Sequence, residues 1–126
     1  EDNVFTGFKT GQSNTTGSYN SFFGYQAGQS NTSGILNVFS GYRAGWKNTT
    51  GGYNTFLGSS AGSANTTAVS NTYLGWGSGR TNTSGSYNVF VGDNAANAML
   101  TRPFREKWID MNVVDWRHKY QQCEMK

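Results

Sequence analysis

A repeat of 17 residues constrains this chain more than any other feature, because a fold must give equivalent positions of each copy equivalent surroundings. The repeat reads N-x-F-x-G-x-x-small-G-x-x-N-T-[T/S]-G-x-[Y/L] and runs without insertion or deletion. Six copies begin at Asn3, Asn20, Asn37, Asn54, Asn71 and Asn88. The third position of each copy is aromatic: Phe5, Phe22, Phe39, Phe56, Tyr73 and Phe90. Such regularity indicates an ordered array rather than a disordered polar tract.

Each copy holds one short segment of aromatic and β-branched residues that ends in glycine, such as Val38-Phe39-Ser40 before Gly41. These residues favour a strand, and the glycine favours a corner. Seventeen residues are too few for a helix pair or a propeller blade. The sequence therefore predicts an all-β fold over residues 1–97, a parallel β-solenoid or β-roll of six coils about 4.8 Å apart. The Asn-Thr segment of each copy is predicted to be a second short strand or a turn.

Stacked coils place equivalent side chains in ladders. We expect the third-position aromatic residues to form one ladder inside the solenoid, and the asparagines to form hydrogen-bonded ladders from coil to coil. The other inward positions are predicted to be Ala27, Ala44 and Ala61, together with the seventeenth-position residues Tyr19, Leu36, Tyr53 and Tyr87.

Several apolar side chains have no place inside a single coil, among them the outward strand residues Phe23, Leu57, Leu74 and Val91. Packing several chains together would bury them, and symmetric homo-oligomers are the common solution. The sequence leaves open whether the assembly is a closed oligomer or a growing filament.

Residues 98–126 depart from the repeat and carry most of the charge. Thr101 followed by Pro103 is a plausible helix start. Ile109, Val113, Trp116, Tyr120 and Cys123 follow the 4-3-4-3 spacing of a coiled-coil seam. We expect either a helical stalk start or a terminal helix or strand that caps the solenoid.

The segments NSFFGYQAG, NVFSGYRAG, NTFLGSSAG and NTYLGWGSG resemble the repeats of trimeric fibrous surface proteins, namely phage or phage-like tail fibres and the heads of trimeric autotransporter adhesins. The usual adhesin-head repeat is shorter and carries Val-Ala-Ile-Gly in place of the aromatic step, so tail-fibre repeats match at least as well. The resemblance implies a left-handed homotrimeric β-roll that leads into a coiled-coil stalk. It also implies a location on a virion or cell surface or outside the cell. The family has no fixed binding motif, so no binding residue is carried over.

The residues give no indication of an enzyme, a cofactor or a metal site. His118 is the only histidine and follows Asp115 by three residues, a spacing typical of a surface pair on a helix. Cys123 is the only cysteine, which excludes a disulfide within the chain. The net charge of +3 is small and of mixed sign along the chain, unlike a nucleic-acid-binding stripe. No apolar run is long enough to insert into a membrane.

The twelfth-position asparagines Asn14, Asn31, Asn48, Asn65 and Asn82 all lie in Asn-Thr-[Thr/Ser] glycosylation sequons. A structural asparagine ladder is the preferred interpretation, and N-glycosylation is the alternative. The adjacent threonines Thr15, Thr32, Thr49, Thr66 and Thr83 form a regular array of the kind an ice-binding solenoid presents, which is a minor alternative function.

The best candidates for a ligand-binding surface are the sixth-position aromatic residues Phe8, Tyr25, Tyr42 and Trp76, with Trp46 and Arg43 or Arg80 nearby. Exposed aromatic residues stack on sugars and anchor protein contacts. The alternative is that these rings are buried between subunits.

The expected function is that of an extracellular structural and adhesive fibre, whose shaft or head presents a repetitive surface to a glycan or protein receptor. A self-assembling filament without a specific receptor is the alternative. In the fourth copy, Ser59, Ala68 and Ser70 replace an aromatic residue, a glycine and an aromatic residue. We therefore expect an intact fourth coil with a polar notch on its flank.

Overall fold

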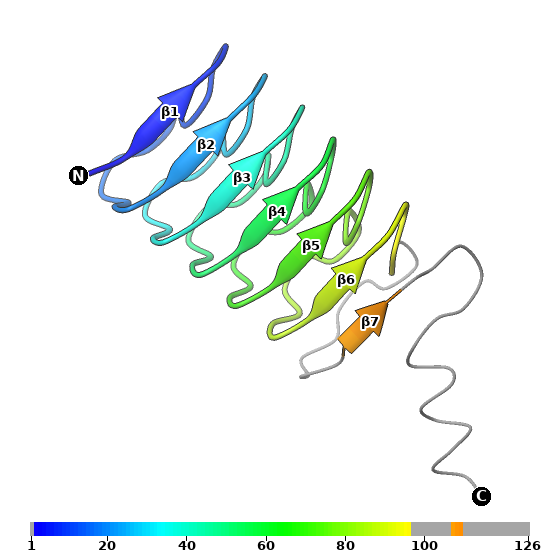
Figure 1. Ribbon diagram of the computed structural model, residues 1–126. Helices are drawn as coiled ribbons and strands as arrows, with labels where there is room; N and C mark the ends of the chain where they lie inside the picture. The colour runs from blue at the N-terminus through cyan, green and yellow to red at the C-terminus, as the bar shows by residue number, and fades with distance from the viewer. Residues whose placement is uncertain (1, 97–106, 110–126) are drawn as a thin grey trace, which may run out of the picture.

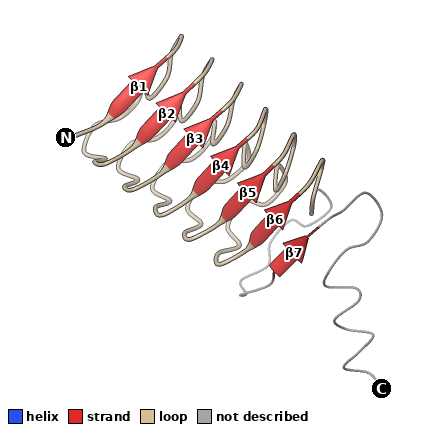
Figure 2. Ribbon diagram, viewed as in Figure 1, coloured by secondary structure: helices blue, strands red, loops and turns tan. Residues whose placement is uncertain are grey.

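The computed structural model describes residues 2–96 and 107–109, which form an all-β parallel solenoid (Figure 1). The coils stack in chain order, and one short strand of each coil joins a single sheet on one side, with loops and turns making up the rest (Figure 2). The strands are β1 (Val4–Thr6), β2 (Ser21–Phe23), β3 (Val38–Ser40), β4 (Thr55–Leu57), β5 (Thr72–Leu74), β6 (Val89–Val91) and β7 (Lys107–Ile109). The predicted parallel solenoid is thus confirmed, with about five complete turns followed by a sixth repeat strand rather than six complete coils. The Asn-Thr segments are bends rather than second strands.

Strand pairing keeps the repeat in strict register. Val38 lies beside Ser21 on one side and beside Thr55 on the other, so each pair is 17 residues apart. The last strand, β7, pairs in parallel with β6, with Lys107 beside Val89. A helix therefore does not run through residues 107–109, and this part of the C-terminal prediction is wrong in favour of the strand alternative. The remaining seam residues Val113, Trp116, Tyr120 and Cys123 lie outside the described residues.

The third-position aromatic residues form the core ladder. Phe22, Phe39, Phe56, Tyr73 and Phe90 are fully buried, and neighbouring rings stack with centroids 4.6–4.9 Å apart. Ala27, Ala44 and Ala61 fill the space beside them as predicted. A flat ring in every coil suits this architecture, because the separation between rings is set by the spacing of parallel strands.

The ninth-position glycine of each of the first five coils makes room for the ring. Gly45 adopts φ +59°, and a Cβ atom added there would lie 2.5 Å from two carbons of the Phe39 ring. A side chain at this position meets both a left-handed backbone and an occupied core. This double requirement explains why glycine recurs at the ninth position of the first five copies. The sixth copy has Ala96 at that position, with φ of +56°.

The first-position asparagines form a buried ladder that fixes the coil spacing. The backbone N–H of Asn37 donates to Oδ1 of Asn20 at 2.9 Å, and the Asn37 amide Nδ2 donates to the carbonyl of Gly51 at 2.9 Å. Equivalent bonds link the coils that begin at Asn3, Asn20, Asn54, Asn71 and Asn88. Because these amides are buried, each bond satisfies polar groups that water does not reach.

The twelfth-position asparagines form a second ladder that is interrupted once. Nδ2 of Asn48 donates to Oδ1 of Asn31 at 2.8 Å, and Nδ2 of Asn65 donates to Oδ1 of Asn48 at 2.7 Å. Asn82 instead donates to the phenol oxygen of Tyr73 at 2.5 Å. Oδ1 of Asn65 is consequently buried without a hydrogen-bond partner among the described residues. The interruption falls where the core ladder contains tyrosine in place of phenylalanine.

We expect Tyr73→Phe to keep or raise stability, by up to about 1 kcal/mol, because Asn82 regains Asn65 as its acceptor. Loss of a buried hydroxyl would ordinarily lower stability by a similar amount. Burial raises the pKa of Tyr73 above its ordinary value of 10.0. The unfolded chain therefore loses this proton at lower pH than the folded chain, and native stability falls as the pH rises above about 10. Denaturant titrations across alkaline pH should show a shallower decline for Tyr73→Phe than for the wild type.

The control for this variant is Tyr87→Phe, which removes an exposed hydroxyl. It should leave the alkaline profile of the wild type unchanged. A loss of more than about 1 kcal/mol in Tyr73→Phe at neutral pH would contradict the predicted change of partner.

The seventeenth-position residues do not face the core, and this prediction is wrong. Tyr19, Leu36, Tyr53 and Tyr87 are exposed, Tyr53 by 58%. Each adopts a left-handed backbone conformation, with φ of +59° at Tyr53. That conformation turns the corner before the next strand and directs the side chain outward. The sequence alone gave no indication of it, because bulky residues seldom adopt positive φ.

Candidate functional site

The sixth-position aromatic residues form an exposed rank at the corner that follows each strand. Phe8 stacks on Tyr25 with ring centroids 5.3 Å apart, and Tyr25 stacks on Tyr42 at 5.4 Å. The rank is interrupted by Ser59 in the fourth coil and resumes with Trp76 in the fifth. Tyr42 is 47% exposed and Trp76 is 50% exposed. The structure therefore brings the predicted residues into one line along the rod.

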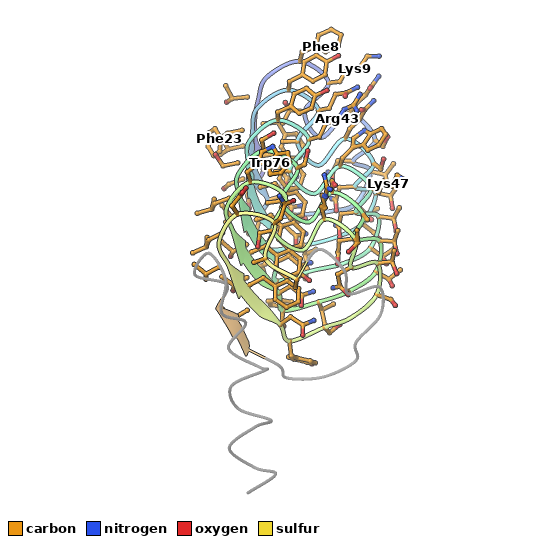
Figure 3. The ribbon with its side chains drawn as sticks, turned by 90° about the vertical axis from the view of Figure 1, so that its right-hand side faces the viewer. Phe8, Lys9, Phe23, Arg43, Lys47 and Trp76 are labelled. Atoms are coloured by element: carbon orange, nitrogen blue, oxygen red, sulfur yellow. The ribbon has the colours of Figure 1, made fainter. Side chains whose placement is uncertain are left out.

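Cationic side chains lie against these rings. The Arg43 guanidinium is 5.2 Å from the Tyr42 ring centroid and 4.6 Å from that of Trp46. Figure 3 shows Phe8 and Lys9 together at one end of this edge, and the Lys9 ammonium lies 5.4 Å from the Phe8 ring. Lys47 approaches Trp46, and Arg80 approaches Trp76. We call this set the corner surface: Phe8, Lys9, Tyr25, Tyr42, Arg43, Trp46, Lys47, Trp76 and Arg80.

Hydrogen bonds between coils hold the corner surface in place. Nε of Arg43 donates to Oε1 of Gln26 at 2.7 Å, and Nε1 of Trp46 donates to Oε1 of Gln29 at 3.0 Å. Gln29 in turn donates to Gln12 at 3.0 Å. The rings and cations are thus positioned before any ligand arrives, which lowers the entropy cost of binding.

The corner surface contains all four lysine and arginine residues of the segment 2–96. The carboxylates of that segment are Asp2, just before the first coil, and Asp93, at the sixth position of the sixth coil, one step beyond Trp76. Sequence reasoning noted Arg43 and Arg80 beside the rings but not Lys9, Lys47 or the glutamines. Lys9 and Gln26 share position 7 with Arg43, and Gln12 and Gln29 share position 10 with Arg80, which was the available signal. Lys47, at position 11, shares its position with none of them.

The surface that adjoins this corner on the strand side has a different character. We call it the strand face: the outward residues of β1–β6 and the seventeenth-position residues. Its exposed large side chains are Val4, Tyr19, Phe23, Leu36, Val38, Tyr53, Leu57 and Tyr87. No position of the strand face is charged. Figure 3 shows Phe23 of the strand face on one side, Lys47 of the corner surface on the other, and Trp76 of the corner surface between them.

The fourth coil is intact, as expected. Strand β4 pairs on both sides, and Phe56 stacks between Phe39 and Tyr73. Ser59 interrupts the aromatic rank and Ser70 interrupts the seventeenth-position rank. The fourth coil therefore leaves a polar gap between Tyr42 and Trp76 on the corner surface.

The sequon asparagines face inward. Asn31, Asn48, Asn65 and Asn82 are fully buried, and Asn31 donates from Nδ2 to Asn14. Glycosylation modifies this same Nδ2 atom, so a glycan would break the ladder. The structure favours the asparagine ladder at these positions.

The threonine array next to the sequons is also engaged in coil contacts. The Thr32 hydroxyl donates to the carbonyl of Thr49 at 3.1 Å, and Thr49 and Thr66 repeat this bond with the next coil. Because these hydroxyls are used within the solenoid, no observation favours the ice-binding alternative.

The described part of the chain contains neither a metal-ligand cluster nor a membrane-spanning helix. Residues 2–96 and 107–109 contain no cluster of three metal-ligating side chains. In the same residues no helix is long and apolar enough to cross a membrane. Asp115, His118 and Cys123 lie outside them. No protein-family model, curated protein or solved structure matches the chain.

Proposed function

We propose that this chain is a segment of a trimeric extracellular fibre, on a virion or cell surface, that presents its corner surface to a receptor. The strand faces pack against neighbouring chains, and the corner surfaces point to solvent. The observation that carries this proposal is the segregation of the two surfaces around a regular rod. One is uncharged and rich in exposed apolar side chains, and the other carries rings together with every cation of residues 2–96.

The two surfaces differ in what burial would cost. An exposed apolar row of this length is typical of a protein interface. Burying Lys9, Arg43 and Lys47 against equivalent cations of another copy would be strongly unfavourable unless each gained a partner. Closed symmetry lets the strand faces bury each other, and the number three follows from the resemblance to trimeric fibres.

Sedimentation of the purified full chain tests this assembly. We expect one species with the mass of three chains. We expect Leu57→Glu to dissociate it, because the substitution places like charges in the interface. Leu57 is 39% exposed, so glutamate is accommodated in a single coil. The matched control is Thr50→Glu, which adds the same charge at an exposed turn and should leave the mass unchanged.

The other outcomes separate the alternatives. A species whose mass grows with protein concentration would contradict the closed trimer and support the filament alternative. A monomer at all concentrations, or a trimer unaffected by Leu57→Glu, would contradict burial of the strand face.

A further inference from the structure

We propose that the gap between Tyr42 and Trp76 binds one ring of an acidic polysaccharide. The inference rests on the proposed function, since it names the class of receptor that the corner surface takes. It concerns one coil of the rod rather than the whole aromatic rank.

Stacking geometry selects the fourth coil. Tyr25 lies between Phe8 and Tyr42 in the stack, so both of its faces have an aromatic neighbour. Tyr42 has Tyr25 on one side and Ser59 at the equivalent position on the other. Ring faces rather than ring edges are the part of an aromatic side chain that packs flat against another ring. Tyr42 is therefore the ring of the Phe8–Tyr42 stack that is open toward the fourth coil.

The size of the gap suits a single ring. Tyr42 and Trp76 belong to coils two steps apart, which corresponds to about 10 Å along the rod. A ring held midway would lie about one coil step, roughly 5 Å, from each side chain. Tyr25 and Tyr42 already stack at a similar separation of 5.4 Å. The ligand would thus replace the aromatic residue that the fourth coil lacks.

The floor of the gap favours a sugar over a purely aromatic ring. Ser59 and Ser60 are half-buried, and their hydroxyl groups can exchange hydrogen bonds with a polyhydroxylated ligand. Their backbones are fixed, because Ser60 N–H donates to the Tyr42 carbonyl and Gly77 N–H donates to the Ser59 carbonyl. A pyranose ring has a flat face of C–H groups for the aromatic side chains and hydroxyl groups for the serines.

The charges around the gap favour an acidic sugar. Arg43 and Lys47 lie in the third coil, and Arg80 lies in the fifth, so cations flank the gap along the rod. Asp93 occupies the sixth position two coils beyond Ser59, and Asp2 lies before the first coil, so no carboxylate of residues 2–96 lies in the third, fourth or fifth coil. A carboxylate or sulfate on the bound sugar, or on the sugars beside it, would meet these cations. Binding should therefore weaken as the ionic strength rises.

Affinity electrophoresis and calorimetry of the full chain test this assignment, with polygalacturonate as the acidic probe and dextran as the neutral one. We expect binding to polygalacturonate and at least about tenfold weaker binding for Trp76→Ala, as for a central aromatic anchor. Ser59→Tyr should weaken binding comparably, because it fills the gap while leaving every cation in place. Thr67→Tyr is the matched control, since it adds the same ring at an exposed bend of the fourth coil, away from the gap, and should bind as the wild type does.

Four results would overturn the inference: no binding of polygalacturonate by the wild type, equal binding of dextran, unchanged binding in Ser59→Tyr, or tighter binding of single-stranded polythymidylate with the same dependence on Trp76. Sedimentation of the same samples keeps the tests separate. If the chain is a trimer but does not bind acidic polysaccharide, only the ligand assignment is wrong. If the chain is a monomer, the proposed trimeric assembly is wrong.

Discussion

Phe56→Ala is expected to destabilise the chain by about 3–5 kcal/mol, the usual loss for a large aromatic residue deleted from a core. Phe56 is fully buried and stacks on both sides, with ring centroids 4.9 Å from Phe39 and 4.6 Å from Tyr73. Each coil of a solenoid is stabilised mainly by its neighbours, so loss of a central ring weakens two coil contacts. The first three coils then lose support from the last two. Denaturant unfolding followed by circular dichroism, at one fixed protein concentration, measures the change.

The control is Phe5→Ala in the first coil. Phe5 is only half-buried and stacks on Phe22 alone among the described rings. Its loss should be roughly half that of Phe56→Ala, because one coil contact is weakened instead of two. Equal losses at the two positions would contradict nearest-neighbour stabilisation.

Gly45→Ala is expected to cost roughly 2–5 kcal/mol although it adds one methyl group. A left-handed conformation costs an alanine about 1–2 kcal/mol. The new Cβ would also lie 2.5 Å from carbons of the Phe39 ring, which is held between Phe22 and Phe56. Moving a packed ring adds about 1–3 kcal/mol. Thermal unfolding at fixed concentration should show the melting temperature falling accordingly.

Gly52→Ala provides the matched comparison within the same coil. A Cβ atom at Gly52 would lie 3.0 Å from the Ile35 carbonyl oxygen, with no ring in the way. The equivalent positions carry Ser18, Ile35, Val69 and Ser86, so a side chain is accommodated there. We expect a change within about 1 kcal/mol, of either sign. A loss at Gly52 as large as that at Gly45 would show that the Phe39 contact is not the cause.

The sequence predicted the strands, their parallel order and the identity of the core ladder because these follow directly from the repeat. Equivalent residues one period apart must stack once the coil closes, so Phe39 necessarily lies over Phe22. The same reasoning placed Asn37 on Asn20, where the structure has a backbone N–H donating to a side-chain oxygen. Periodicity could not reveal which way a corner residue points. Tyr53 turns outward because its φ is +59°, and that angle depends on how the corner closes.

The candidate site was predicted in part. The aromatic rank was visible because Phe8, Tyr25 and Tyr42 share one position of the frame. The cations beside the rings occupy three other positions, 7, 10 and 11, and come together only when the corner folds. The sequence could not predict that Asn82 donates to Tyr73 instead of Asn65, because this bond depends on how far the phenol group of Tyr73 extends across the core.

The asparagine ladders have a consequence for how such chains change length. Every bond of the first ladder joins residues 17 or 14 positions apart, so each junction between coils is chemically the same. Gain or loss of one complete 17-residue repeat would bring together coil surfaces that already fit each other. The length of the rod would then change by one coil at a time. The junction between the fourth and fifth coils is the exception, and it lies in the second ladder. Asn82 bonds to Tyr73 of its own coil there and leaves Oδ1 of Asn65 without a partner. Repeats could therefore be added or lost on either side of this junction without changing the contacts between coils. The two repeats that form the junction itself would have to stay together.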